Sequence, residues 1–229
     1  MTRIAFLHTG AVVIAPVIEQ ARTALPSATF VNYLDDRIVA DLGDPQRAAS
    51  VPERVEALAH AARSGGADVI MLTCSSISQL AAPTAAAVGI PVLRIDEAMA
   101  DAATEAGERI AVLATLPTTL APTVGLLRER ADLAGRHPLI VEEVVEGAFA
   151  AVVAGDRATH DRLVAEAIDR LGAQADVVVL AQASMASAAT AAHVSVPVLT
   201  SIAPGIERLR AFVSVLPTAD QASERSPRT

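Results

Sequence analysis

The sequence predicts an α/β fold of two pseudo-symmetric lobes, each a short parallel sheet flanked by helices. Short apolar runs alternate with helical stretches along the chain, which is typical of parallel sheets covered on both faces. The chain also repeats itself. Arg3–Gly10 (RIAFLHTG) recurs as Arg109–Leu116 (RIAVLATL), and Ile90–Leu93 recurs as Val196–Leu199, each 106 positions later. Matched segments at a constant offset indicate two homologous halves.

The individual elements follow from β-branched runs and helical periodicity. We expect strands at 3–8, 28–32, 68–72 and 91–93 in the first half and at 109–114, 139–141, 176–180 and 197–199 in the second. Helices are expected near 13–24, 50–64, 76–88, 96–106 and 203–215. The last of these helices should return to the first lobe, so that 1–96 with 203–216 form one lobe and 97–202 the other. Residues 217–229 have no apolar face to bury and predict a disordered tail.

The composition of the chain argues against several classes of protein. A net charge of −8 and an aromatic content of 2% argue against nucleic-acid binding. No apolar run reaches the length of a membrane span, and Met1 leads directly into a strand, which leaves no room for a signal peptide. A single cysteine cannot form an intramolecular disulfide, so a reducing, cytoplasmic location is expected. Alanine-rich helix faces leave small apolar surfaces for a homodimer or a higher homo-oligomer.

The sole cysteine lies in a repeated segment. Ala67–Ser78 (ADVIMLTCSSIS) recurs as Ala175–Ala186 (ADVVVLAQASMA), and Cys74 falls opposite Gln182. Each segment is a buried strand that turns through small residues into a helix. The two halves therefore have the same design but different chemistry at this position.

The strand ends indicate where a ligand would bind, because ligands of parallel sheets collect beyond the carboxyl ends of the strands. Four loops occupy that position, namely 8–10, 73–76, 115–119 and 182–184. Ser75 and Ser76 at a helix start predict a carboxylate site, and we expect Thr118, Thr119 and Ser184 to act similarly in the other lobe. No arginine lies in these loops. The same helix start is expected to lower the pKa of Cys74.

These motifs together resemble the aspartate/glutamate racemase superfamily, over about residues 3–215. That group includes glutamate, aspartate and hydantoin racemases, maleate isomerase and arylmalonate decarboxylase. The resemblance implies an active site in the cleft between two α/β lobes and a small carboxylate substrate. In the racemases, one cysteine from each lobe transfers a proton on each face of the α-carbon, without a metal or pyridoxal phosphate. The resemblance therefore implies that no cofactor is needed.

Cys74 matches the first-lobe catalytic cysteine of this family, and Ser75, Ser76, Thr115 and Thr118 match positions at the carboxylate site. The second-lobe cysteine has no counterpart, because Gln182, Ala183 and Ser184 stand in its place. A tyrosine typical of the isomerase and decarboxylase members is also replaced, by Leu116-Pro117. An amide does not exchange protons with carbon, so Gln182 cannot serve as the second acid or base.

A single thiol still permits several reactions. Cys74 could act on one face in decarboxylation and protonation, in tautomerisation or in elimination, or its thiolate could add to a double bond as in the maleate isomerase branch. Arylmalonate decarboxylase also uses one cysteine, although in its second lobe. The alternatives are an amino-acid or hydantoin racemase with a non-cysteine second base, and an inactive protein that binds small carboxylates.

The candidate site comprises one catalytic residue, Cys74, and a set of substrate-binding residues: Thr9, Gly10, Ser75, Ser76, Thr115, Thr118, Thr119, Gln182, Ala183 and Ser184. His8 is a further candidate, either in contact with substrate or Cys74 or as a structural histidine. The other histidines, His60, His137, His160 and His193, are interpreted as surface residues. No spacing of histidine, cysteine and acidic residues resembles a metal site.

Overall fold

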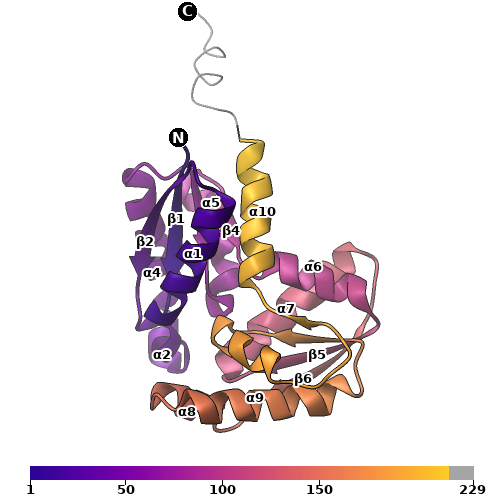
Figure 1. Cartoon of the computed structure of the whole chain (residues 1–229). Helices are drawn as coiled ribbons and strands as arrows, with labels where there is room; N and C mark the ends of the chain where they lie inside the picture. Colours follow the sequence, from indigo (N-terminus) through magenta and orange to yellow (C-terminus); the bar gives the residue numbers. More distant parts are fainter. Residues whose placement is uncertain (217–229) are drawn as a thin grey trace, which may run out of the picture.

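The computed structural model describes residues 1–216 and has two four-stranded parallel sheets, each flanked by helices (Figure 1). The predicted α/β class with two lobes is confirmed. The predicted disordered tail, 217–229, lies outside the described residues.

The first sheet has the strand order β2-β1-β3-β4. Its strands are β1 (Arg3–His8), β2 (Thr29–Leu34), β3 (Val69–Leu72) and β4 (Val92–Arg94). Its helices are η1 (Ala11–Val13), α1 (Ile14–Ala24), α2 (Ile38–Leu42), α3 (Pro45–Ala48), α4 (Val51–Ser64), η2 (Ser75–Leu80) and α5 (Ala81–Val88), where η marks a 3₁₀ helix.

The second sheet repeats this order as β6-β5-β7-β8. Its strands are β5 (Arg109–Ala114), β6 (Leu139–Val144), β7 (Val177–Leu180) and β8 (Val198–Leu199). The remaining helices are α6 (Glu97–Ala106), α7 (Pro117–Leu133), α8 (Ala148–Val153), α9 (Arg157–Gly172), η3 (Ala183–Thr190) and α10 (Ile202–Ser214). The shared strand order is the structural counterpart of the repeat in the sequence.

The helix predicted over 76–88 differs from the structure. It is divided into a 3₁₀ segment, η2, and the α-helix α5. Three serines lie in η2, and serine hydroxyl groups compete for backbone hydrogen bonds, which favours tight turns over a regular α-helix. As a result, the chain leaves β3 through a short, tight turn.

The core lies on both faces of each sheet, because successive strand residues point to opposite sides. In β1, Ala5 and Leu7 pack toward α4, whereas Ile4 and Phe6 pack toward α1 and α10. The second sheet is covered in the same way, by α8, α9 and η3 on one face and by α6 and α7 on the other. The buried strands therefore read as continuous apolar runs.

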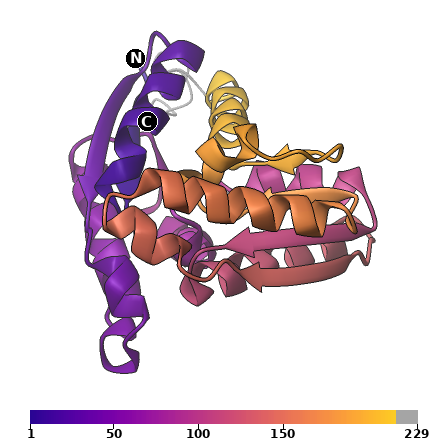
Figure 2. The same cartoon turned by 60° about the horizontal axis from the view of Figure 1, so that its bottom comes forward.

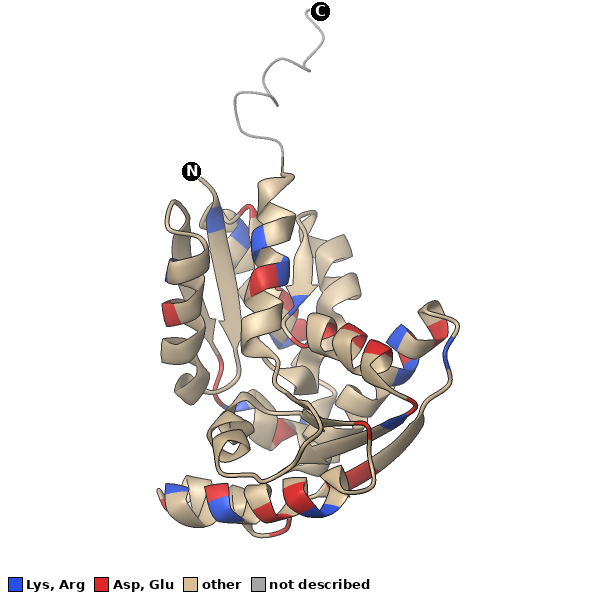
Figure 3. Ribbon diagram, turned by 45° about the vertical axis from the view of Figure 1, so that its right-hand side comes forward, with Lys and Arg blue, Asp and Glu red and all other residues tan. Residues whose placement is uncertain are grey.

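Helix α10 connects the lobes. Its residues Ile202, Ile206 and Leu209 lie in the same core cluster as Ile4 and Val17 of the first lobe. Figure 1 shows α10 in yellow beside α1, with α6 near its base. Arg208 of α10 pairs with Glu97 and Asp101 of α6. Charged residues gather at this junction and along α9, as Figure 3 shows.

We predict that Gly205→Ala destabilises the protein. A Cβ atom at position 205 would collide with the carbonyl oxygen of Ile95, so α10 could not keep its contact with the segment after β4. Overpacking of this kind costs about 1–3 kcal/mol, to be measured by urea denaturation.

Gly125→Ala is the matched control, because position 125 lies on an exposed part of α7 with open space around it. The greater helix propensity of alanine should leave this variant as stable as the wild type or more so, by up to about 1 kcal/mol. Equal stability of Gly205→Ala and wild type would contradict the proposed close contact.

Candidate active site

The carboxyl ends of strands from both sheets face a cavity of about 860 Å³ between the lobes. Figure 2 shows the strands of the first lobe, in indigo, standing across the second sheet. The cavity walls come from the loops after β1 and β3 and from α2 in one lobe, and from the loops after β5 and β7 and from α8 in the other. The predicted gathering of these loops at one cleft is therefore present.

Most of the predicted site residues line this cavity. They are Thr9, Gly10, Cys74, Ser75, Ser76, Thr118, Thr119, Gln182, Ala183 and Ser184. Thr115 and His8 are buried behind the wall and are not among the lining residues.

Cys74 caps the N-terminus of η2 with an extended backbone conformation, φ −131° and ψ 124°. The expected lowering of its thiol pKa is wrong. Burial raises the pKa of Cys74, and this effect exceeds the opposing hydrogen bonds from Thr9 and from the backbone and side chain of Ser76. The short 3₁₀ turn is a weaker source of positive potential than a full α-helix, so Cys74 is held as a neutral thiol at neutral pH.

Ser75 and Ser76 connect the two lobes. The Ser75 hydroxyl donates to the carbonyl oxygen of Ala181 at 3.0 Å, and the hydroxyls of Ser76 and Thr119 lie 3.0 Å apart. A carboxylate can only accept hydrogen bonds, and Ser75 has a single hydroxyl proton. The Ser75 side chain therefore cannot bind a carboxylate while it holds Ala181, whereas the Ser76–Thr119 pair keeps one proton for another acceptor.

Thr115 positions Gln182 and does not itself line the cavity. Its backbone N–H and its hydroxyl both donate to Oε1 of Gln182, at 2.6 Å and 3.0 Å. A backbone N–H can only donate, so the amide atom that faces it must be the oxygen. The NH₂ group of Gln182 is then the end available to a ligand. This places a hydrogen-bond donor of fixed orientation where the repeat has Cys74 in the other lobe.

His8 lies in a buried environment and is hydrogen-bonded through both ring nitrogens. Its side chain is fully buried, with Nε2 2.8 Å from Oδ1 of Asn32 and Nδ1 2.8 Å from the hydroxyl of Thr73. Burial lowers the pKa of His8, although the hydrogen bond with Asn32 opposes this effect. A neutral imidazole that is bonded on both nitrogens supports the structural interpretation over contact with substrate.

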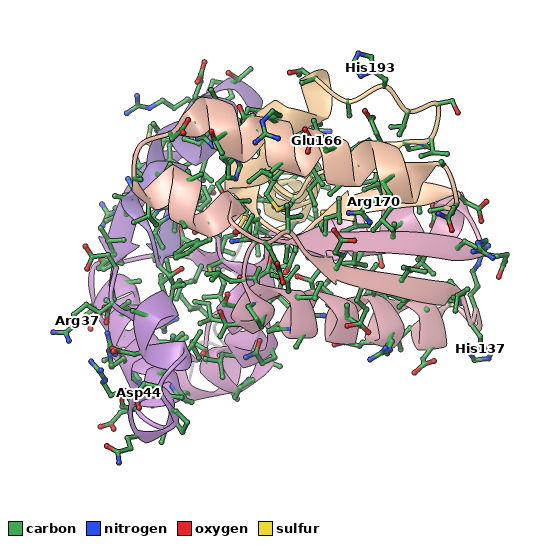
Figure 4. All side chains as sticks on the ribbon, turned by 90° about the horizontal axis from the view of Figure 1, so that it is seen from below. Arg37, Asp44, His137, Glu166, Arg170 and His193 are labelled. Atoms are coloured by element: carbon green, nitrogen blue, oxygen red, sulfur yellow. The ribbon has the colours of Figure 1, made fainter. Side chains whose placement is uncertain are left out.

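The interpretation of His160 as a surface residue is wrong. His160 is fully buried, and its Nδ1 lies 2.8 Å from Oδ1 of Asp161. It shares the inner face of α9 with Val164 and Ile168, which are also fully buried. This i, i+4, i+8 spacing was readable in the sequence. His60, His137 and His193 are exposed, and Figure 4 shows the last two at the periphery.

An apolar part of the cavity wall was not predicted from the sequence. Its residues are Val12, Val13, Val39, Ala40, Phe149, Val152 and Val153. Val39 and Ala40 lie on α2, which follows β2, and Phe149, Val152 and Val153 lie on α8, which follows β6. The two helices occupy equivalent places in the two halves, so the repeat itself was the available signal.

A further residue outside the cavity supports the second-lobe turn. Arg157, at the start of α9, donates to the carbonyl oxygen of Ser184 at 2.8 Å. No sequence pattern connects these positions, which are 27 residues apart. The contact helps to hold the segment that carries Gln182.

The cavity carries little charge. Among the lining residues within 1–216, Asp36 is the one side chain with a formal charge at neutral pH. Helix α7 begins at the wall, with Leu116 as its N-cap and Pro117 as its first residue. A helix of 17 residues directs positive potential toward its start. Pro117 has no N–H, and the N–H groups of Thr119 and Leu120 donate to the carbonyl oxygen of Leu116, which leaves the N–H of Thr118 for a ligand. An anion bound here would rely on this amide, on hydroxyls and on the Gln182 NH₂ group.

A model of the Asp/Glu/hydantoin racemase family matches residues 7–209. A glutamate racemase isoform from Bacillus anthracis is 16% identical, with a TM-score of 0.75, over 93% of this chain and 82% of the other. Allantoin racemase from Klebsiella pneumoniae is 19% identical, with a TM-score of 0.63, over 100% and 95%. Arylmalonate decarboxylase is 20% identical, with a TM-score of 0.56, over 91% and 92%. At these identities the structures establish a common fold. None of the curated proteins matches significantly in sequence.

Within 1–216, no cluster of three or more histidine, cysteine, aspartate or glutamate side chains has the arrangement of a metal site. No helix of that part of the chain combines the length and apolarity needed to cross a membrane.

We predict that Thr9→Val slows alkylation of Cys74 by iodoacetamide. The Thr9 hydroxyl stabilises the thiolate, so its loss should raise the thiol pKa further and reduce the thiolate fraction. A hydrogen bond to an ionised group contributes about 1.5 kcal/mol, which corresponds to a roughly tenfold slower reaction near neutral pH.

Thr118→Val makes the same change elsewhere on the cavity wall and should leave the rate close to that of wild type. Equal rates for all three proteins would show that Thr9 does not contact the thiol.

Proposed function

The chain belongs to the Asp/Glu/hydantoin racemase family and is an enzyme of that superfamily, and we propose that it acts, without a cofactor, at the carbon next to a small carboxylate. Cys74 is its sole thiol acid, base or nucleophile. The observation that carries this proposal is the pairing across the cavity, with Cys74 on one lobe and the fixed NH₂ group of Gln182 on the other.

The arrangement supports proton transfer on one face of the substrate. Racemisation by two bases needs a titratable group on each side of the reacting carbon. Among the lining residues within 1–216, Cys74 and Asp36 are the side chains with an acidic group, and both belong to the first lobe. The second lobe offers Gln182, whose amide donates hydrogen bonds but does not exchange protons with carbon.

The protonation state of Cys74 favours a role as an acid. A thiol with a raised pKa holds its proton at neutral pH and can deliver it to a carbanion. In a decarboxylation, the bond from the α-carbon to the departing carboxylate breaks and CO₂ leaves. The electron pair remains as an enediolate on the other carboxylate, and Cys74 S–H protonates the α-carbon. The resulting thiolate regains a proton from water.

Neutral donors would stabilise the enediolate. The Gln182 NH₂ group, the Thr118 hydroxyl and the start of α7 provide hydrogen bonds and positive potential from the second lobe. Such donors do most for the reaction when the negative charge on the carboxylate oxygens grows. The carboxylate that is kept would therefore face the second lobe, with the α-carbon toward Cys74.

The apolar part of the wall suggests the substrate class. Phe149, Val152 and Val39 offer contact to an apolar substituent, which aspartate and glutamate lack. Alkyl- or aryl-substituted malonates and related acids fit this wall better than free aspartate or glutamate.

The setting of the enzyme is also proposed from the sequence. A single cysteine suits a reducing compartment, so we place the protein in the cytoplasm. A homodimer or larger homo-oligomer stays a prediction based on the alanine-rich helix faces.

A panel of carboxylates in deuterated water tests the proposal. We expect wild-type protein to decarboxylate or isomerise an apolar-substituted acid, or to exchange its α-proton, with deuterium detected by NMR. Cys74→Ser should lose at least about 10²-fold in rate, because general acid–base catalysis contributes that much. Retention of full activity in Cys74→Ser would overturn the role of the thiol, and a folded wild type that binds but never turns over a panel member would favour a binding protein.

Gln182→Cys should acquire exchange on both faces of a chiral substrate. The variant would place a thiol opposite Cys74, so that interconversion of enantiomers becomes measurable by chiral chromatography. Gln182→Ser introduces a side chain of similar size to cysteine but without a thiol, so it should not gain exchange on the second face. If Gln182→Cys folds and still exchanges on one face alone, position 182 does not face the reacting carbon.

A further inference from the structure

The 3₁₀ segment η3, which begins directly after Gln182, is not continued by another helix. In the first lobe, η2 leads straight into the α-helix α5. In the second lobe, η3 ends at Thr190, and residues 191–197, which form no helix, connect it to β8. A 3₁₀ helix has poor hydrogen-bond geometry, and a run as long as the eight residues of η3 is uncommon. The second-lobe turn therefore depends on contacts from outside it to keep its shape.

Two such contacts come from the beginning of α9. Arg157 donates to the carbonyl oxygen of Ser184 at 2.8 Å, and the hydroxyl of Ser187 donates to Oδ1 of Asp161 at 2.9 Å. Arg157 and Asp161 lie one turn apart, with Nη1 of the arginine 3.9 Å from Oδ1 of the aspartate. Helix α9 thus holds η3 at two points that follow Gln182 along the chain.

His160 orients the Asp161 carboxylate from inside the lobe. Its ring is fully buried, and its Nδ1 lies 2.8 Å from Oδ1 of Asp161, whose side chain is 24% exposed. A carboxylate can only accept hydrogen bonds, so Nδ1 carries the proton and Nε2 is left as an acceptor. Nε2 is buried and has no hydrogen-bond partner among the described residues. An unpaired buried nitrogen is costly, and the bond to Asp161 explains why a histidine is kept here.

A shift of η3 would reach Gln182 directly. Gln182 is the N-cap of η3, and its carbonyl oxygen accepts from the N–H of Met185 at 3.0 Å. Its side-chain oxygen is bound by Thr115 in the loop after β5. The backbone at position 182 must therefore stay in place for the side chain to keep that bond.

We propose that Asp161, oriented by His160, is a positioning residue that fixes η3 and thereby keeps the Gln182 NH₂ group directed at the cavity. Asp161 does not line the cavity and acts through its bond to Ser187. The use of the NH₂ group in ligand binding rests on the proposed function. Its placement needs no substrate and can be measured separately.

Amide hydrogen exchange of the whole chain, followed by NMR, tests this proposal. The Thr115 N–H donates to Oε1 of Gln182 at 2.6 Å, so its exchange rate reports whether the amide stays in place. In Asp161→Ala we expect Thr115 to exchange about tenfold faster, because the turn loses a hydrogen bond to an ionised group. The N–H of Val112, in the buried middle of β5, should keep its wild-type rate. A loss of stability alone would accelerate both amides by the same factor.

Glu166→Ala is the matched control, because it removes an exposed carboxylate of the same helix that pairs with Arg162 (Figure 4). Its Thr115 rate should equal that of wild type. Ser187→Ala removes the η3 partner of Asp161, should also accelerate Thr115, and replaces Asp161→Ala if that variant does not fold. A folded variant with an unchanged Thr115 rate, or with equal acceleration of Thr115 and Val112, overturns the proposal. Because exchange is measured without substrate, this result is independent of whether the proposed reaction occurs.

Discussion

The hydrogen bond from Ser75 to the carbonyl oxygen of Ala181 joins the two repeated turns on which the site depends. One partner directly follows Cys74 and the other directly precedes Gln182. The contact therefore fixes the separation of the two residues whose difference defines the chemistry. The Ser76–Thr119 hydroxyl pair adds a second bond between the lobes. Both bonds are buried, where an unmade hydrogen bond is costly, so the lobes are held together at the floor of the cavity.

This use of the serines moves ligand recognition toward the second lobe. The Ser75 hydroxyl is not free to compensate a negative charge, and the Ser76–Thr119 pair keeps one proton for that purpose. The start of α7, the Thr118 hydroxyl and the oriented Gln182 amide are further donors, and all three belong to the second lobe. Thr115 is essential to this arrangement, since it fixes which end of the amide faces the cavity. The first lobe supplies the thiol and the second supplies the neutral donors.

The sequence predicted the fold well because its signals are local or repeated. Buried parallel strands read as apolar runs, and the offset between halves located the loops that meet at the cleft. The direction of the Cys74 pKa shift was not predictable, because burial in the folded protein outweighs the local effect of a turn. The hydrogen-bond partners of the serine hydroxyls were not predictable either, since Ser75 and Ala181 are 106 residues apart. The helical spacing of His160 with Val164 and Ile168 indicates a buried position. The polar residues on either side of His160 in the sequence do not.

The sequence difference between the two halves makes the site chemically asymmetric. In a symmetric pair of turns, equal groups would approach both faces of a substrate, and the reaction would run equally well from either enantiomer. Here the thiol lies on one side of the cavity, while the equivalent turn of the other lobe holds an amide fixed by Thr115. A proton delivered from the first lobe reaches one face alone. Stereochemical control then follows from which lobe carries the titratable group, since the two lobes share one backbone design.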